Sequence, residues 1–483
     1  MSSKLDATKT LEALPQQQSK SIQQEWDELY RQFKHKIIVL DDDPTGVQTV
    51  HGVSVYTNWD LTSIEDGFNE ENQMFFILTN SRSFSVKETE DVHQTIAKRI
   101  NHVSQKLGIP FLIISRGDST MRGHYPLETE TLRQSLEACS KETAFDGEII
   151  IPFFEQGGRW TIDNVHYVKQ ENTLIPVGET EFAKDPSFGF SSSDLAEYIE
   201  EKTNGLFSKE EAISIDLPLI RSGNTEAVKE KLMEATSFQK IIVNAVNEED
   251  IRVFSIGLLK ALFKQKQFLF RTGATFTKII GNISSRPLLS SQELRDSSSK
   301  NGGLVVVGSH VRKTTEQLEQ VKQLTSLAFI EFDCHLVFNK EAFSEEQNRI
   351  RNEAEKAVEQ GQTAVIYTRR ELVNLEHSSA DEILAVSVRI ADALTDVVKS
   401  FAVRPSFIIA KGGITSSDIG TNGLGVTKAI VAGQISPGVP VWTTDEGSKF
   451  PGLPYIIFPG NVGTKDTLKD IIEHLDINDK NSK

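Results

Sequence analysis

Three consecutive aspartates, Asp41, Asp42 and Asp43, follow the apolar run KIIVL and precede the triplet PTG. Carboxylates gathered at one point of a chain can hold a magnesium ion, accept hydrogen bonds from hydroxyl groups or accept a proton. They can equally be the solvated turn that ends a strand. This stretch leaves the alternatives open, and the residues at the ends of other apolar runs have to decide between them.

Other short apolar runs also end in polar residues that can bind a ligand. Arginine binds carboxylate or phosphate groups through two parallel hydrogen bonds, and aspartate accepts hydrogen bonds from hydroxyls or acts as a base. Any single arginine can instead pair with a neighbouring acid, but the whole set predicts a site for a small, hydroxylated acid. The candidate residues are Thr45 and Gly46 after KIIVL, Arg82 after MFFIL, Arg116, Asp118, Ser119, Thr120 and Arg122 in and after FLIISR, and Arg159 after EIIIPFF.

The segment SRGDSTMRG combines several of these residues. It follows a strand-like run and leads into a helix that we expect to begin near Leu127, so it is typical of a helix start that binds an anion. A simple helix cap is the alternative. Because Asp118 is flanked by Arg116 and Arg122, we favour a binding site.

The second half of the chain has three glycine-containing loops, each directly after an apolar run. Glycine lets the backbone approach a phosphate closely, and exposed amides at a helix start favour negative charge. None of the loops matches GxxxxGKS or GxGxxG, so each alone is a weak indication, but three in one domain favour nucleotide binding. Their residues are Gly308 and Ser309 after LVVV, Gly412, Gly413 and Thr415 after FIIAK, and Gly460 after YIIFP.

Composition excludes several classes of protein. The net charge of −16 argues against a nucleic-acid-binding protein, because phosphate contacts require a basic face. No segment approaches the roughly 20 continuous apolar residues that span a bilayer, and the opening residues do not form a secretory signal, so we expect a cytoplasmic protein. GxSxG and HExxH motifs are absent from the sequence, and Cys139 and Cys334 stand alone, which makes a serine hydrolase, a zinc enzyme or a disulfide framework a poor interpretation.

The alternation of apolar runs with helix-like periodicity predicts α/β architecture with two domains, each a largely parallel sheet flanked by helices. The polar stretch QELRDSSSKNGG interrupts this alternation at residues 292–303, so we place the domain boundary there. We therefore expect a helical extension over residues 1–34, an acid-binding domain over 35–295 and a nucleotide-binding domain over 303–478.

The motifs LDDDPTG, SRGDSTMRG, GRWTIDNVHYV with PVGETEFAKDP, GGITSS and FPGNVG occur in an order and spacing that resemble the four-carbon acid sugar kinase family. The resemblance runs from about Lys36 to about Leu475. It implies a first domain that binds a sugar acid such as threonate, erythronate or a 3-oxo-tetronate, and a second domain that binds ATP. Such an enzyme transfers the terminal phosphoryl group of ATP to a substrate hydroxyl in carbohydrate catabolism.

By position, the resemblance implies a role for the acidic pair Asp42 and Asp43, followed by Thr45 and Gly46, and for the segment 116–123. It places the nucleotide loops at Ser309, at residues Gly412, Gly413, Ile414 and Thr415, and at Gly460. Two positions depart from the family pattern: Arg116 replaces a lysine, and Ile414 replaces an acid. The first changes the geometry of a cation that bears on substrate identity, and the second removes a carboxylate near the nucleotide.

The mechanism that we expect is in-line phosphoryl transfer from ATP, with Mg²⁺ as its companion ion, after domain closure. Arg82, Arg116, Arg122 and Arg159 are candidates to hold the substrate carboxylate and the phosphoryl group. One of Asp42, Asp43 and Asp118 would accept the hydroxyl proton, and we favour Asp118 because the flanking arginines would keep it ionised.

Two other functions stay open at this point. A dehydrogenase of a hydroxy acid would use a dinucleotide at the glycine loops, although its fingerprint is missing. A sugar-acid sensor without catalysis would explain Ile414. The residues leave open the identity of the metal ligands, the sugar acid, the hydroxyl that is phosphorylated and whether the chain forms a homodimer.

Overall fold

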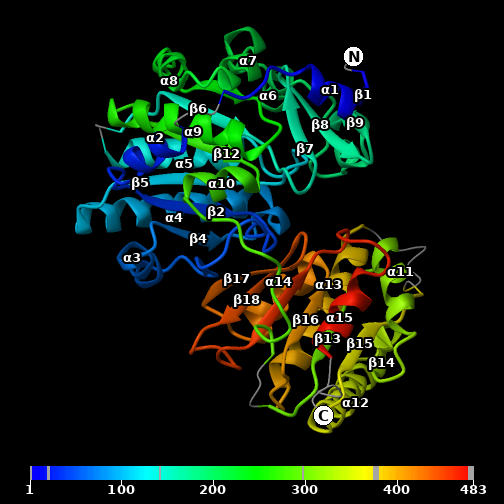
Figure 1. The fold of residues 1–483 in the computed structure, drawn as a ribbon. Helices are drawn as coiled ribbons and strands as arrows, with labels where there is room; N and C mark the ends of the chain where they lie inside the picture. The colour runs from blue at the N-terminus through cyan, green and yellow to red at the C-terminus, as the bar shows by residue number, and fades with distance from the viewer. Residues whose placement is uncertain are drawn as a thin grey trace. The chain divides into compact units, whose positions relative to one another are not determined.

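The computed structural model describes residues 3–18, 22–140, 143–295, 299–371, 373 and 380–476. The chain forms two compact units (Figure 1). Unit 1 comprises Met1–Thr49 and Asn58–Ser284, and unit 2 comprises Val50–Thr57 and Ser285–Lys483. Residues 477 and 478, at the end of the expected nucleotide-binding domain, lie outside the described part.

The main sheet of unit 1 is parallel throughout. Its strands β2 (Lys36–Asp41) and β4 (Met74–Leu78) are buried at every position, as expected when helices cover both faces of a parallel sheet. In spatial order the strands are β10 (Ile213–Ile215), β11 (Gln239–Val243), β6 (Gly147–Ile151), β12 (Phe268–Thr272), β5 (Phe111–Arg116), β2 (Lys36–Asp41) and β4 (Met74–Leu78).

Several helices of unit 1 begin at a residue whose side chain caps the first turn. Ser85 and Glu88 form a capping box at the start of α4, and Gly108 ends that helix in the left-handed conformation. This cap also fixes the loop after β4, which carries Arg82. The helices are α1 (Ala7–Ala13), α2 (Ile22–Tyr30), α3 (Leu61–Asn69), α4 (Val86–Leu107), α5 (Leu127–Cys139), α6 (Leu195–Lys202), α7 (Leu217–Arg221), α8 (Thr225–Met233), α9 (Glu248–Phe263) and α10 (Ala274–Ile280).

The N-terminal segment is part of unit 1 rather than a helical addition to it. Strand β1 (Leu5–Asp6) joins a small antiparallel sheet with β9 (Thr173–Pro176), β8 (Val165–Gln170) and β7 (Arg159–Ile162). Trp26 of α2 is fully buried, and its ring nitrogen donates to Asn282 Oδ1 at 2.9 Å. Burial of this large ring explains why the segment lies on the core.

Unit 2 has a mixed sheet, in which the strands that carry the glycine loops are parallel. The antiparallel part, β3–β17–β18–β19, includes residues 54–56 from the first part of the chain. In spatial order the strands are β3 (Ser54–Tyr56), β17 (Lys428–Ser436), β18 (Val439–Thr444), β19 (Pro454–Phe458), β16 (Ile408–Lys411), β13 (Leu304–Val307), β15 (Ala364–Thr368) and β14 (Ala328–Phe332). The helices are α11 (Arg312–Val321), α12 (Lys340–Glu359), α13 (Ala380–Ser400), α14 (Gly413–Asp418) and α15 (Thr467–Leu475).

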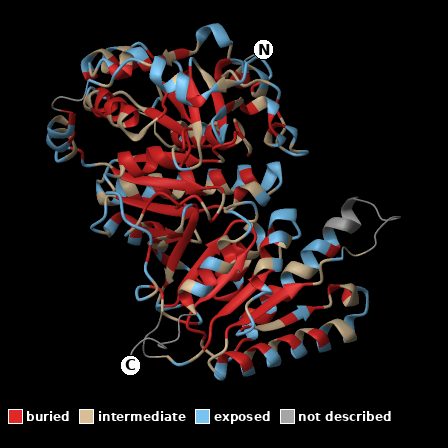
Figure 2. Cartoon of the chain, turned by 45° about the vertical axis from the view of Figure 1, so that its right-hand side comes forward, coloured by how far each residue is buried: buried red, intermediate tan, exposed pale blue. Residues whose placement is uncertain are grey.

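The α/β class and the largely parallel sheets are confirmed, and most strand residues are buried while the helices expose their outer faces (Figure 2). The division between the units differs from the boundary that we expected at 292–303. Leu289 and Leu294 belong to the core of unit 2, so the chain enters this unit before the polar stretch begins. No helix within the described residues has the length and apolar character needed to span a bilayer.

Candidate active site

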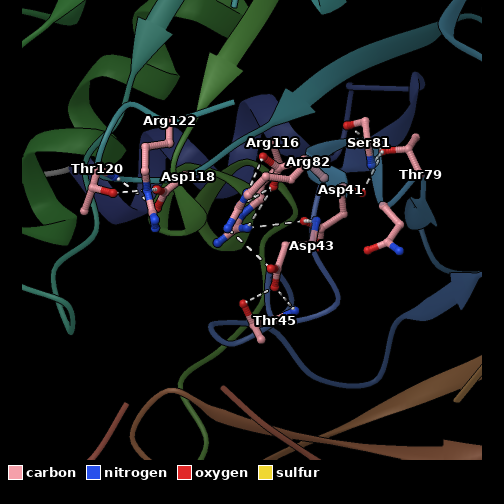
Figure 3. A network of polar contacts seen from close by, with 12 residues as sticks. Asp41, Asp43, Thr45, Thr79, Ser81, Arg82, Arg116, Asp118, Thr120 and Arg122 are labelled. Atoms are coloured by element: carbon pink, nitrogen blue, oxygen red, sulfur yellow. Dashed lines mark hydrogen bonds and ion pairs between the residues drawn. The ribbon is translucent and has the colours of Figure 1, made fainter. Parts of the chain in front are cut away.

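The carboxyl ends of three adjacent strands of unit 1 bring the predicted polar residues together (Figure 3). In the parallel register, Asp41 at the end of β2 lies beside Leu78 of β4 and Arg116 of β5. The loops that follow these strands therefore start at the same edge of the sheet. We call the charged residues gathered there the strand-end cluster; it comprises Asp41, Asp42, Asp43, Arg82, Arg116, Asp118 and Arg122.

Arg82 holds the acidic pair that the motif comparison pointed to. Its Nη2 lies 2.6 Å from Asp42 Oδ1, and its Nε donates to Asp42 Oδ2 at 3.2 Å, so the guanidinium binds this carboxylate at two points. Its Nη1 donates to Asp43 Oδ2 at 3.3 Å. Burial raises the pKa of Asp42 in spite of Arg82, whereas for Asp43 the opposing effect of burial is outweighed by Arg82 and Thr45 and the pKa is lowered.

Asp41 is fully buried and lies against Arg116, whose Nη1 is 3.3 Å from Asp41 Oδ1. Burial raises the pKa of Asp41 to about 7, against the opposing effect of Arg116. A side chain on Gly46 would overlap the Asp41 carboxylate, so glycine is required for the loop to fold back on this acid. Asp41 and Gly46 thus shape the loop, while Asp42 and Asp43 face Arg82.

Asp118 is the acid of the cluster that pairs with Arg122. Its Oδ2 accepts from Arg122 Nε at 2.6 Å and from Thr120 Oγ1 at 2.5 Å, while its Oδ1 accepts from the amide of Thr120 at 3.2 Å, a longer bond that leaves room at Oδ1 for another donor. Burial alone would raise the pKa of Asp118, but Arg82 and Arg122 outweigh burial and hold it well below its usual range. The carboxylate is therefore ionised at neutral pH.

Arg159 differs from the other predicted arginines because it forms no ion pair within the described part of the chain. Its guanidinium lies over the ring of Phe182, with 5.8 Å between Cζ and the ring centroid, and Arg122 lies over the same ring at 5.1 Å. The Nε atom of Arg159 is buried without a hydrogen-bond partner among the described residues. Burial lowers the pKa of Arg159, and the nearby Asp118 opposes that shift.

The remaining predicted residues of unit 1 support the loops. Thr45 donates from its amide to Asp43 Oδ1 at 2.8 Å, which closes a turn after the acidic run. Thr120 caps Asp118 in the same way. Ser119 is held through its carbonyl, which lies 2.8 Å from His166 Nε2.

The sequence interpretation missed four residues that line or support this site: Phe182, Asp185, Glu128 and Arg271. Asp185 Oδ2 lies 3.6 Å from Arg122 Nη1. Phe182 and Asp185 belong to the motif EFAKDP, which was quoted without a role for either residue. Arg271 lies in FLFRT, an apolar run with the same pattern as the other strand ends, and that pattern could have identified it.

In unit 2, two of the three predicted glycine loops line a cavity of about 650 Å³. The predicted residues Ser309, Gly412, Gly413, Ile414 and Thr415 all lie in its wall. Its remaining lining is largely apolar and includes Val386, Ile390 and Leu394 of α13. Size and lining both suit a small organic ligand.

Gly460 is not in that wall, but it lies beside Ser309: a Cβ on Gly460 would be 3.3 Å from Ser309 Oγ. Its carbonyl accepts from Thr314 Oγ1 and from Lys411 Nζ, each at 3.1 Å. Burial, together with the charge of Lys313, lowers the pKa of Lys411 to about 7. The three glycine loops are therefore brought together, as their order along the sheet predicts.

The comparisons with known proteins also divide the chain into two domains. A family model described as a sugar-binding N-terminal domain matches residues 37–280, and one described as a nucleotide-binding C-terminal domain matches residues 304–468. The chain belongs to the four-carbon acid sugar kinase family. The resemblance inferred from the motifs is thus confirmed.

A curated member of this kinase family, the D-erythronate kinase of Heliobacterium modesticaldum, is 22% identical over 476 residues, which cover 91% of this chain and 97% of the relative. A solved structure from Haemophilus influenzae superposes with a TM-score of 0.61 at 17% identity, and one from Salmonella typhimurium LT2 with 0.65 at 16%; each match covers 91% of this chain and 98% of the other. These two structures share the fold.

Proposed function

We propose that this chain is an ATP-dependent kinase that phosphorylates a hydroxyl of a small sugar acid. The observation that carries the proposal is the occurrence, in one chain, of a sugar-binding domain with a charged strand-end cluster and a nucleotide-binding domain with a glycine-lined cavity. D-erythronate is the first candidate substrate, because a relative over almost the whole chain is named for it. In-line phosphoryl transfer depends mainly on positioning and charge neutralisation, which clustered arginines and carboxylates supply.

In this proposal the substrate carboxylate binds to Arg159. This guanidinium has a buried donor without a partner among the described residues, whereas Arg82 and Arg122 already pair with acids. Asp118 accepts a hydrogen bond from the reacting hydroxyl and then its proton, since its Oδ1 has room for a donor. Arg122 and Arg82 keep Asp118 ionised for that step.

The cofactor would be ATP with Mg²⁺, and the wall of the unit 2 cavity fits the nucleotide. Gly412 and Gly413 allow close approach of the backbone to phosphate, and the apolar residues suit a base. Bound ATP supplies the phosphoryl group that is transferred. The described residues contain no group of three acidic, histidine or cysteine side chains able to hold a metal ion.

Replacing Gly412 by alanine should weaken ATP binding about tenfold or more, because its φ of 128° is close to a region reserved for glycine and its Cβ would lie 3.0 Å from Ser309 Cβ. Titration calorimetry with ATP measures the effect. Gly425→Ala is the matched control: its φ is also positive, at 64°, but no atom lies within 4 Å of the added Cβ. Equal affinities for both variants would contradict the role of Gly412.

Replacing Arg159 by methionine should raise KM for the sugar acid about 10- to 100-fold and change KM for ATP little, because only the substrate carboxylate loses its partner. The control is Arg133→Met, which removes a guanidinium that likewise lies over a phenylalanine ring, Phe238, at 4.6 Å, outside the strand-end cluster. Steady-state kinetics with each substrate varied in turn separate the two constants. An unchanged KM for the sugar acid would exclude Arg159 as the carboxylate ligand.

The proposed function itself is tested with purified protein, ATP, Mg²⁺ and a panel of four-carbon and longer sugar acids. Release of ADP that depends on one acid supports the kinase. NADH formation from an acid with NAD would support a dehydrogenase instead. Tight binding of an acid without turnover of either cofactor would support a sensor.

A further inference from the structure

A buried ion pair lies directly beneath the strand-end cluster. Arg271, in the central strand β12, forms a close ion pair with Glu128, the second residue of α5. Arg271 is 9% exposed and Glu128 is 1% exposed. Neither side chain has a part in the chemistry described so far, so the pair needs an explanation of its own.

Hydrogen bonds connect this ion pair to the two loops that carry the residues of the site. Arg271 Nη2 donates to the carbonyl of Arg122 at 3.3 Å, and its Nη1 donates to Ser115 Oγ at 3.0 Å. Glu128 Oε1 accepts from Ser81 Oγ at 2.6 Å. Ser81 adjoins Arg82, so a single ion pair ties the loop after β4 to the loop after β5.

The backbone around Asp118 lies against the guanidinium of Arg271. A Cβ added to Gly117 would overlap the guanidinium, and one added to Gly123 would lie 2.8 Å from Arg271 Nη2. The glycine at 123 also adopts a φ of 115°, which a side chain disfavours. The segment that carries Asp118 is thus flanked at both ends by glycines that pack on Arg271.

Both members of the pair are charged at neutral pH. Burial would raise the pKa of Glu128, but Arg271 outweighs burial and lowers it to about 2. Burial would likewise lower the pKa of Arg271, but Glu128 raises it. His93 Nε2 lies 4.0 Å from Glu128 Oε1, and burial lowers the pKa of His93 below its usual value, against the opposing effect of Glu128.

We propose that Arg271 and Glu128 are positioning residues for phosphoryl transfer: they hold the loop 117–123 and the loop at Ser81 so that Asp118 and Arg82 meet the substrate in a fixed arrangement. The inference rests on the proposed function. Arg271 acts through the carbonyl of Arg122 and the glycine contacts, and Glu128 acts through Ser81. A displacement of about 1 Å at reacting groups can cost about 100-fold in rate, so a loop held by one ion pair makes turnover sensitive to that pair.

A purely structural role predicts a different result, and unit 1 offers a matched pair to distinguish them. Arg221 and Asp250 form another buried ion pair, 3.0 Å between Arg221 Nε and Asp250 Oδ1, with side chains 8% and 0% exposed. Arg221 Nη1 also donates to the carbonyl of Pro15, and the amides of Val246 and Asn247 donate to Asp250 Oδ2. Loss of this pair should therefore lower stability without moving the loops of the site.

The test compares Arg271→Met and Arg221→Met in the full chain, using thermal unfolding, titration with ATP and steady-state kinetics with the sugar acid that the wild type accepts. We expect both variants to unfold at lower temperature and to bind ATP as the wild type does. We expect kcat to fall at least about 100-fold in Arg271→Met and to stay within about threefold of the wild type in Arg221→Met. Arg271→Lys should recover part of the loss, because it keeps the charge but not the two-pronged geometry.

If Arg271→Met does not fold, Glu128→Gln tests the same ion pair, because it keeps the volume of the side chain and removes its charge. We expect this variant to have a kcat at least about tenfold lower and an unchanged KM for ATP. Wild-type kcat in a folded Arg271→Met or in Glu128→Gln would overturn the positioning role alone. Absence of turnover by the wild type with every sugar acid would overturn the proposed function, and the positioning role with it.

Discussion

Replacing Asp118 by asparagine is expected to lower kcat by about 10²- to 10⁴-fold while ATP binding is unchanged. The substitution keeps the shape of the side chain and its contact with the amide of Thr120, but it removes the negative charge that accepts the hydroxyl proton. Asp42 and Asp43 are engaged by Arg82, whereas the Oδ1 atom of Asp118 accepts a single longer hydrogen bond, from the amide of Thr120, which is why we propose Asp118 as the acceptor. Single-turnover phosphate transfer and calorimetry with ATP measure the two effects separately.

Asp185→Asn is the matched control for this substitution. Asp185 Oδ2 lies 3.6 Å from Arg122 Nη1, whereas Asp118 Oδ2 accepts from Arg122 Nε, so the substitution removes a comparable charge beside the same arginine. We expect at most about a tenfold loss of kcat, the size of an indirect electrostatic change of about 1.4 kcal/mol. Near-normal turnover of Asp118→Asn would eliminate Asp118 as the base and leave Asp42 and Asp43 as the alternatives.

Replacing Arg82 by glutamine is expected to destabilise the protein by about 3 kcal/mol and to abolish most activity. Asp42 is 2% exposed and would lose both hydrogen bonds from the guanidinium, and a buried charge without its partner is costly. Since burial already raises the pKa of Asp42, loss of Arg82 would raise it further. The folded variant would then bind more protons than the unfolded chain, so its deficit in stability should shrink as the pH falls.

Urea unfolding at about pH 8 and about pH 5 measures both parts of this prediction, with a larger deficit expected at the higher pH. The control is Arg99→Gln, which breaks an exposed ion pair with Asp60 in which the side chains are 34% and 74% exposed. It should cost less than about 1 kcal/mol at either pH. A deficit for Arg82→Gln that does not change with pH would exclude Asp42 as the group responsible.

Much of the fold follows from local sequence patterns. After Lys36, the residues IIVL are all apolar, are followed by acids and form most of the buried strand β2, and the apolar run MFFIL forms the buried strand β4. Because both faces of these strands are covered, burial is continuous and the pattern is unambiguous. The strand ends then bring the predicted residues together, since parallel strands end at one edge of the sheet.

The parts that could not be predicted depend on contacts between distant residues. Strand β12 follows α9 after only a short polar stretch, and apolar periodicity does not separate a helix from an adjacent buried strand. Residues 54–56 pair with β17 near residue 428, a partner that no local pattern reveals. For the same reason the sequence indicated that arginines and acids meet, but not that Arg82 binds Asp42 at two points or that Arg159 has no acid partner among the described residues.

Identification of the product by phosphorus NMR tests the central claim most directly. The protein is incubated with ATP, Mg²⁺ and D-erythronate or the other sugar acids, and the new phosphorus resonance is assigned. We predict a phosphate monoester on a hydroxyl of one sugar acid, formed together with ADP and missing when Asp118→Asn replaces the wild type. An acyl phosphate, or ATP that stays intact with every acid, would contradict the assignment of this chain as a sugar-acid hydroxyl kinase.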